Sequence, residues 1–107
     1  MNQKRSVLLV IFDLPAVTAE EKRLYARFRK KLISDGYTAI QESVYLRLLP
    51  HRQAIDGALR ELDLDSPKEG AVFALPLTLS QFAQMTVIRG RPFDLGQFAD
   101  DVLYIGA

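Results

Sequence analysis

The clearest hydrophobic pattern in the chain is an uninterrupted apolar run near the N-terminus. It covers residues 7–12 and is followed by Asp13, Leu14 and Pro15. The run has a strand-like composition and is too short for a typical helix, so it predicts a buried strand. Pro15 ends this strand because its backbone nitrogen has no hydrogen to donate. Asp13 is therefore expected at the end of a buried strand.

Two later segments show helical periodicity. Residues 18–34 start with Thr18 and Glu21, the pattern of a capping box, and stop at Asp35-Gly36. Residues 51–64 predict a second helix, which ends at residues 65–67. The side chains expected to pack on a sheet are Leu24, Tyr25, Phe28 and Leu32 in the first helix, with Glu21 on the same side, and Ile55, Leu59 and Leu62 in the second.

The remaining apolar segments predict strands at residues 37–41, 43–49 and 70–77, and one more at 85–89. The order is β-α-β-β-α-β with an extra C-terminal strand, which predicts an α+β, ferredoxin-like fold for residues 1–90. Residues 91–107 are interpreted as a C-terminal docking segment of the same domain. Its apolar run is expected to add to the edge of a sheet in a sister subunit or a partner protein, and consists of Val102, Leu103, Tyr104 and Ile105.

The first strand is apolar on both faces, which predicts a partner for the sheet. Leu8, Val10 and Phe12 alternate with residues 7, 9 and 11. Two helices on one face leave the other face open, and an open apolar face of this size favours a homodimer packed sheet to sheet. The alternative cover is the C-terminal segment of the same chain.

Composition excludes several classes of protein. A chain of 107 residues fits one domain. It has no cysteine, which excludes disulfides and thiolate metal sites and suits a reducing compartment. The longest apolar run is far shorter than a bilayer span, so no membrane association is expected and the predicted location is the cytoplasm.

Charge is unevenly distributed along the chain. The net charge is only +1, but residues 1–31 hold eight Lys and Arg against three acidic residues. Arg23, Arg27, Lys30 and Lys31 follow helical spacing and form one stripe, with Lys22 and Arg29 on the other side of the apolar seam. Two interpretations stay open: a surface that contacts a nucleic-acid backbone, or a helix face that only confers solubility. No regularly interleaved aromatics favour base stacking, so duplex contact fits better.

Asp13 also has two interpretations. It could cap the turn before Thr18, or it could bind a cation. One Asp per chain is too few for a metal hydrolase site, but a symmetric dimer would bring two copies together, and two carboxylates can hold Mg²⁺. His51 is the sole histidine and lies at a helix start, which disfavours a Ser-His-Asp triad or a His-rich zinc site.

Several motifs, taken in order, resemble one known family. A strand ending Phe-Asp-Leu-Pro at 12–15 precedes a Lys/Arg-rich helix with Tyr-Ala-Arg-Phe-Arg-Lys-Lys-Leu at 25–32. Gly-Tyr at 36–37, Gln41, Ser-Val-Tyr at 43–45 and Arg47 follow, then Leu-Pro-Leu-Thr at 75–78 and Gln-Phe at 81–82. Over residues 5–90 the chain resembles CRISPR-associated protein two, the small subunit of the spacer-acquisition machinery, and is similar to the versions in type II systems.

The resemblance implies a ferredoxin-like homodimer that bridges dimers of the integrase, CRISPR-associated protein one, and holds a double-stranded DNA prespacer. Some members of the family are described as Mg²⁺-dependent endonucleases, so the resemblance also implies an alternative: an Mg²⁺- or Mn²⁺-dependent endonuclease acting on single-stranded RNA or double-stranded DNA, with Asp13 of both subunits as the metal-binding and catalytic residue. The nucleic-acid-binding residues expected from the resemblance and the stripe are Lys22, Arg23, Arg27, Lys30, Lys31 and Arg47.

Overall fold

The computed structural model describes residues 5–90, which form one four-stranded antiparallel sheet and three helices. The strand order is β2-β3-β1-β4, an α+β arrangement compatible with the predicted ferredoxin-like fold. The elements are β1 (Ser6–Asp13), α1 (Ala19–Ser34), β2 (Thr38–Gln41), β3 (Val44–Leu49), α2 (Ala54–Asp65), β4 (Ala71–Thr78) and α3 (Leu79–Phe82).

Local sequence signals set the ends of α1. The Thr18 side chain accepts a hydrogen bond from the backbone N–H of Glu21, and the Glu21 carboxylate accepts from the N–H of Val17 and Thr18. These contacts satisfy donors that a helix start leaves without partners. Gly36 follows the helix with φ +99°, a conformation that glycine adopts without steric cost. The predicted capping box and helix stop are both confirmed.

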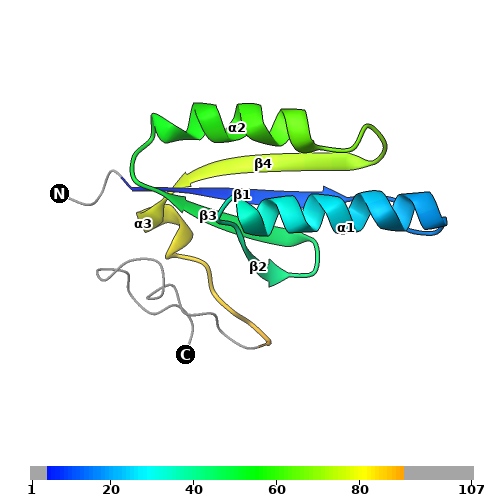
Figure 1. Cartoon of the computed structure of the whole chain (residues 1–107). Helices are drawn as coiled ribbons and strands as arrows, with labels where there is room; N and C mark the ends of the chain where they lie inside the picture. The colour runs from blue at the N-terminus through cyan, green and yellow to red at the C-terminus, as the bar shows by residue number, and fades with distance from the viewer. Residues whose placement is uncertain (1–4, 91–107) are drawn as a thin grey trace.

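Helices α1 and α2 cover one face of the sheet (Figure 1). Phe12 of β1 makes edge-on ring contacts with Tyr25 and Phe28 of α1. The core on this face is formed by Leu8, Val10, Phe12, Leu14, Phe28, Leu32, Tyr37, Tyr45, Leu49, Ile55, Ala58 and Leu62.

The opposite face of the sheet is covered in part by α3, which the sequence pattern did not predict. Phe82 of α3 is buried against Val7, Leu9 and Leu46. A capping box starts this short helix, since Thr78 and Gln81 exchange side-chain-to-backbone hydrogen bonds. The expectation that two helices leave this face bare is therefore corrected: the chain itself covers the end of the sheet where β1 begins.

The predicted extra strand at residues 85–89 is wrong. This segment has no strand pairing, although Thr86, Val87 and Ile88 have the β-branched composition that suggested one. The turn after α3 carries the chain across the sheet face, where the segment lines a hollow beside Ile40 and Val44. It lies beside β2, an edge strand, but forms no backbone ladder with it, and a β-branched composition without such pairing does not make a strand.

Three connections gather at one end of the sheet: β1 to α1, the β2–β3 turn, and the loop from α2 to β4 (Figure 1). Asp13 lies at this end, where it is the register partner of Ala71 in β4. Within residues 5–90, no helix has both the length and the apolar character needed to cross a membrane. The docking segment 91–107, with Val102 to Ile105, lies outside the described residues.

Candidate functional site

Asp13 points away from the helices. Successive residues of a strand alternate between faces, and Phe12 is buried under α1, so Asp13 shares the other face with Val7, Leu9 and Ile11. Asp13 is exposed, and no hydrogen bond or ion pair engages its side chain within the described part of the chain. Its carboxylate oxygens are therefore open to a ligand from solvent.

Exposed apolar side chains lie beside Asp13 on the same face, and Ile11, Phe73 and Leu75 are called the open patch below. Phe73 is the register partner of Ile11, and Leu75 is the partner of Leu9. Ile11 is 40% exposed, Phe73 66% and Leu75 47%. Helix α3 covers the far end of this face and leaves the Asp13 end uncovered. Adjacent exposed apolar side chains are typical of interaction surfaces, so the open patch is a candidate for one.

The described residues of one chain do not form a complete metal site. Among residues 5–90, no three His, Asp or Glu side chains gather closely enough to hold an ion. The exposed, uncommitted carboxylate of Asp13 fits Mg²⁺ or Mn²⁺, because these ions accept one or two carboxylates and fill the remaining positions with water. A second carboxylate would have to come from another copy of the chain, across the face that carries the open patch.

The predicted nucleic-acid-binding residues lie on the helix side of the sheet, and their partners divide them into two groups. Arg23 pairs with Glu20 at 2.7 Å, and this hydrogen-bonded pair raises the pKa of Arg23 and lowers that of Glu20. Lys31 lies 3.4 Å from Asp35 and 4.0 Å from Asp65. An acidic neighbour therefore offsets the charge of each of these partnered cations.

Lys22, Arg27 and Lys30 form the second group, called the free cations below. All three are exposed on α1, and no acidic side chain among residues 5–90 pairs with them. A bound phosphate would not have to displace a carboxylate from them, so they are the stronger candidates for contact with a nucleic-acid backbone.

Arg47 is placed differently from the α1 cations. It is half-buried on the helix side of β3, where its guanidinium lies 5.7 Å from the Tyr37 ring centroid and 3.3 Å from a Glu61 carboxylate oxygen. Burial raises the pKa of the Tyr37 hydroxyl. The position of Arg47 links β3 to α2, and its role in nucleic-acid binding stays a prediction.

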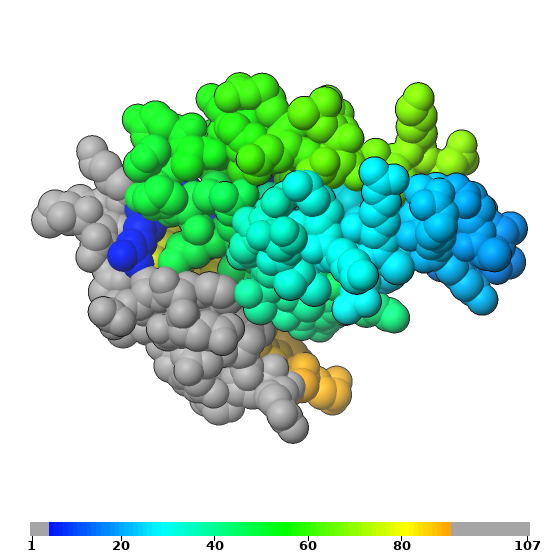
Figure 2. All heavy atoms as spheres, in the orientation of Figure 1, coloured from blue at the N-terminus to red at the C-terminus, as the bar shows by residue number. Residues whose placement is uncertain are grey.

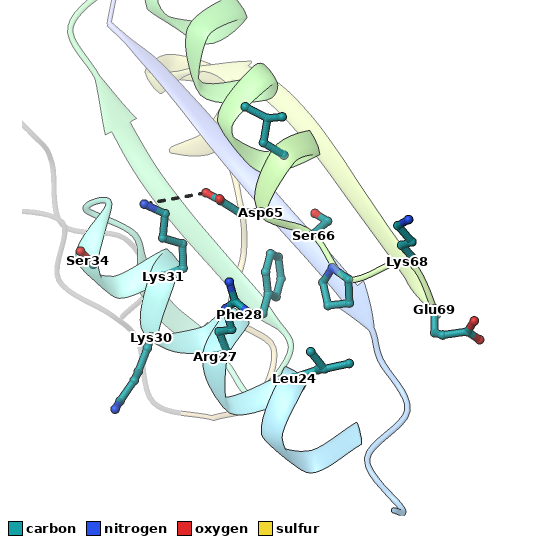
Figure 3. Close-up of a pocket in the computed structure, with 12 residues that line it drawn as sticks. Leu24, Arg27, Phe28, Lys30, Lys31, Ser34, Asp65, Ser66, Lys68 and Glu69 are labelled. Atoms are coloured by element: carbon teal, nitrogen blue, oxygen red, sulfur yellow. Dashed lines mark ion pairs between the residues drawn. The ribbon is translucent and has the colours of Figure 1, made fainter. Parts of the chain in front are cut away.

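A groove runs between α1 and the end of α2 (Figures 2 and 3). Its volume is about 850 Å³, and Arg27, Lys30 and Lys31 line its α1 side. Lys68, on the α2–β4 loop, adds a basic side chain that sequence reasoning missed; the signal available was its place in the short polar segment 65–70. Figure 3 shows Lys31 reaching Asp65 across the groove.

The structure does not bring Asp13 and the α1 cations together. Asp13 faces one side of the sheet, and α1 lies on the other. One bound strand cannot contact both within a single subunit without passing around the edge of the sheet. The candidate metal position and the candidate backbone-binding surface are therefore two separate sites.

Similarity to known proteins points to one family over most of the chain. Residues 6–85 match the family described as CRISPR associated protein Cas2. The CRISPR-associated endoribonuclease Cas2 of Acidovorax ebreus (strain TPSY) is 42% identical over 85 residues, which cover 79% of this chain and 83% of that protein. The protein of the same name from Streptococcus mutans serotype c (strain NN2025) is 39% identical over 83 residues, 78% of each chain. This chain belongs to the CRISPR-associated protein Cas2 family.

Proposed function

We propose that this chain is a dimeric, nucleic-acid-binding scaffold subunit in CRISPR spacer acquisition, and that it holds duplex DNA through its helix layer. The observation that carries the proposal is the placement of the free cations on the opposite side of the sheet from Asp13. A duplex held on α1 would be kept away from Asp13, the candidate catalytic group. Binding without cleavage is what a scaffold requires.

The charges of α1 suit a phosphate backbone. Lys22, Arg27 and Lys30 are exposed and lack acidic partners within residues 5–90. Phe28, the aromatic side chain at the floor of the groove, is 1% exposed and cannot stack on a base. Contact with the backbone of a duplex, in a manner independent of sequence, therefore fits better than recognition of unpaired bases.

The proposed dimer forms through the open patch. Two copies related by a two-fold axis would bury Ile11, Phe73 and Leu75 of each subunit and leave both α1 helices on the outside. The duplex-binding surfaces would then lie on the outer sides of the dimer. The proposed protein partner is the integrase, CRISPR-associated protein one, with residues 91–107 as the docking segment.

Two triple variants test the proposed DNA surface. Replacing Lys22, Arg27 and Lys30 with Ala is expected to weaken binding to unrelated DNA duplexes to a similar extent. The slope of log affinity against log salt concentration should fall by about 0.9 for each phosphate that the variant no longer neutralises. The matched control replaces Arg23, Lys31 and Arg47 with Ala, which removes the same charge from residues that already have acidic partners.

Fluorescence anisotropy at several salt concentrations measures both the DNA affinity and its dependence on salt. The control variant is expected to change affinity and salt slope less than the variant of the free cations. If the variant without the free cations keeps the wild-type affinity and slope, the DNA surface lies elsewhere. If both variants lose affinity equally, the division into free and partnered cations is wrong.

The second candidate function is a metal-dependent endonuclease, and the exposed Asp13 beside the open patch favours it. The relatives above carry the name endoribonuclease. In the proposed dimer the two Asp13 carboxylates would hold Mg²⁺ or Mn²⁺, which polarises a phosphate and activates water when bound. No His or Lys lies beside Asp13 in sequence to act as a base without metal.

Replacing Asp13 with Asn tests this second function. The variant keeps the size of the side chain and removes its charge, so cleavage of single-stranded RNA or duplex DNA should be lost while the dimer mass is unchanged. Asp63→Asn, at an exposed position on α2, is the matched control. Cleavage that persists in EDTA or in the Asp13 variant rules out the metal mechanism. Wild-type protein without cleavage but with DNA binding supports the scaffold.

A further inference from the structure

Gly70 packs directly against the end of β1 that carries Asp13. Its φ is +89°, a backbone conformation that residues with a side chain rarely adopt. A Cβ atom at this position would lie 2.6 Å from the carbonyl oxygen of Asp13 and 3.1 Å from the Cα of Leu14. Both neighbours are backbone atoms, so they cannot rotate aside as the end of a flexible side chain can. Asp13 itself excludes a side chain at residue 70.

The backbone segments around Gly70 have little room to move away from a side chain added at this position. Gly70 immediately precedes Ala71, which is the register partner of Asp13 in the β1–β4 ladder. Leu14 is buried in the core under the helices, and the ring of Pro15 restricts the backbone that follows. A shift of residue 70 therefore displaces the same end of the ladder that carries Asp13.

We infer that Gly70 is a positioning residue for the Asp13 carboxylate. This inference rests on the proposed metal role of Asp13 and adds the element that orients it. No hydrogen bond or ion pair within residues 5–90 holds the Asp13 side chain, so the position of its backbone, which sets the Cα–Cβ bond, is the only restraint on where the carboxylate can reach. Two carboxylates that share one small cation need a narrow geometry, because Mg²⁺ demands near-octahedral coordination.

Gly36 is the matched control. Its φ is +99°, close to that of Gly70, but a Cβ there would meet only the Arg47 side chain, at 3.7 Å. Substitution at residue 36 therefore carries the backbone cost of a positive φ without a collision. Asn is the replacement of choice at both positions, because it tolerates a positive φ better than other residues with a side chain.

The first measurement does not depend on metal. Carbonyl ¹³C chemical shifts of Asp13 and Leu14 are compared by NMR in the wild type, Gly70→Asn and Gly36→Asn. The shifts are expected to change in Gly70→Asn and to stay at their wild-type values in Gly36→Asn. Unchanged shifts in Gly70→Asn overturn the inference, whatever the function of Asp13.

The second measurement is the affinity of the dimer for Mn²⁺, obtained by titration calorimetry, with Asp13→Asn defining the part that depends on this carboxylate. Gly70→Asn is expected to bind Mn²⁺ about 10–100-fold more weakly, the range found when supporting residues of metal sites are changed. Gly36→Asn should bind as the wild type does, and both variants should keep the wild-type mass.

The remaining outcomes overturn the inference in distinguishable ways. Changed shifts with unchanged Mn²⁺ affinity leave Gly70 a purely structural role. A Gly70→Asn variant that fails to fold, beside a folded Gly36→Asn, assigns Gly70 to folding alone. If Asp13→Asn itself leaves Mn²⁺ binding unchanged, the proposed metal site is wrong, and the positioning role is wrong with it.

Discussion

Replacing Phe73 with Ala is expected to dissociate the proposed dimer while leaving each subunit folded. Phe73 is 66% exposed on β4, opposite Ile11 of β1, so most of its ring contributes nothing to the core of its own subunit. In a two-fold symmetric dimer the same patch occurs on both sides of the interface, and one substitution removes two rings.

The size of the effect follows from the exposed area. A Phe side chain buries about 200 Å², of which two-thirds, about 130 Å², is available here and corresponds to about 3 kcal/mol at about 25 cal/mol per Å². For two rings, the loss of association free energy has an upper bound of about 6 kcal/mol. Buried area converts only partly into affinity, so we take about half of this, about 3 kcal/mol, as the expected loss. The dimer dissociation constant should therefore rise roughly 100-fold.

Sedimentation velocity over a range of protein concentrations measures this change. The wild type should sediment with twice the 12.1 kDa chain mass at micromolar concentration, and the variant should shift toward a single chain. Leu64→Ala is the matched control, because Leu64 is 84% exposed but lies on α2, on the helix side. An unchanged dimer in Phe73→Ala, or equal weakening in Leu64→Ala, refutes the placement of the interface. A monomeric wild type refutes the dimer and the paired carboxylates together.

Three further predictions concern the α1 cap and the C-terminus. Thr18→Ala removes the cap of α1 and should cost about 1 kcal/mol, lowering the melting temperature by about 4–8 °C; an unchanged melting curve would contradict the role of the cap. Hydrogen bonds from the backbone N–H of Thr18 and then Val17 lower the pKa of Glu21 below 4.5. The ionised form therefore stabilises the fold above that pH, and this stabilisation is lost as the pH falls through the lowered value. Urea midpoints measured from pH 7 into the acid range should depend less on pH in Glu21→Gln, and identical profiles would exclude the effect. Truncation after Phe98 should either abolish integrase binding in a pull-down or lower the mass in light scattering from that of two chains to that of one. If the pull-down is unchanged and the truncated protein keeps the mass of two chains, residues 99–107 are not a docking element.

Local patterns in the sequence determined much of the architecture. The alternation of residues 7–12 assigned Leu8, Val10 and Phe12 to one face and Val7, Leu9 and Ile11 to the other, as observed. The capping box at Thr18 and the glycine stop at residue 36 set the ends of α1. These features depend on neighbours within a few residues, so the chain specifies them before any tertiary contact forms.

The structure of the C-terminal part of the described chain depended on long-range contacts. The composition of residues 85–89 favoured a strand, but after the turn that follows α3 this segment runs beside β2 without pairing with it. Helix α3 is too short for a periodic signal, and its place is set by the packing of Phe82 on Val7, Leu9 and Leu46. Pairing partners and packing surfaces far apart in sequence decide such segments.

For the candidate sites, the sequence by itself determined that Asp13 ends a buried strand and that α1 is basic. Only the tertiary structure placed them on opposite sides of the sheet, since α1 could have crossed either face. It also divided the cations by their partners, because Glu61, which binds Arg47, is fourteen residues away in sequence. The contact of Gly70 with Asp13 joins residues fifty-seven positions apart. Charge and periodicity are local properties of a chain. The sheet face that a helix covers, the partner of a charged side chain and the contact between two distant backbones exist only after distant segments have packed together.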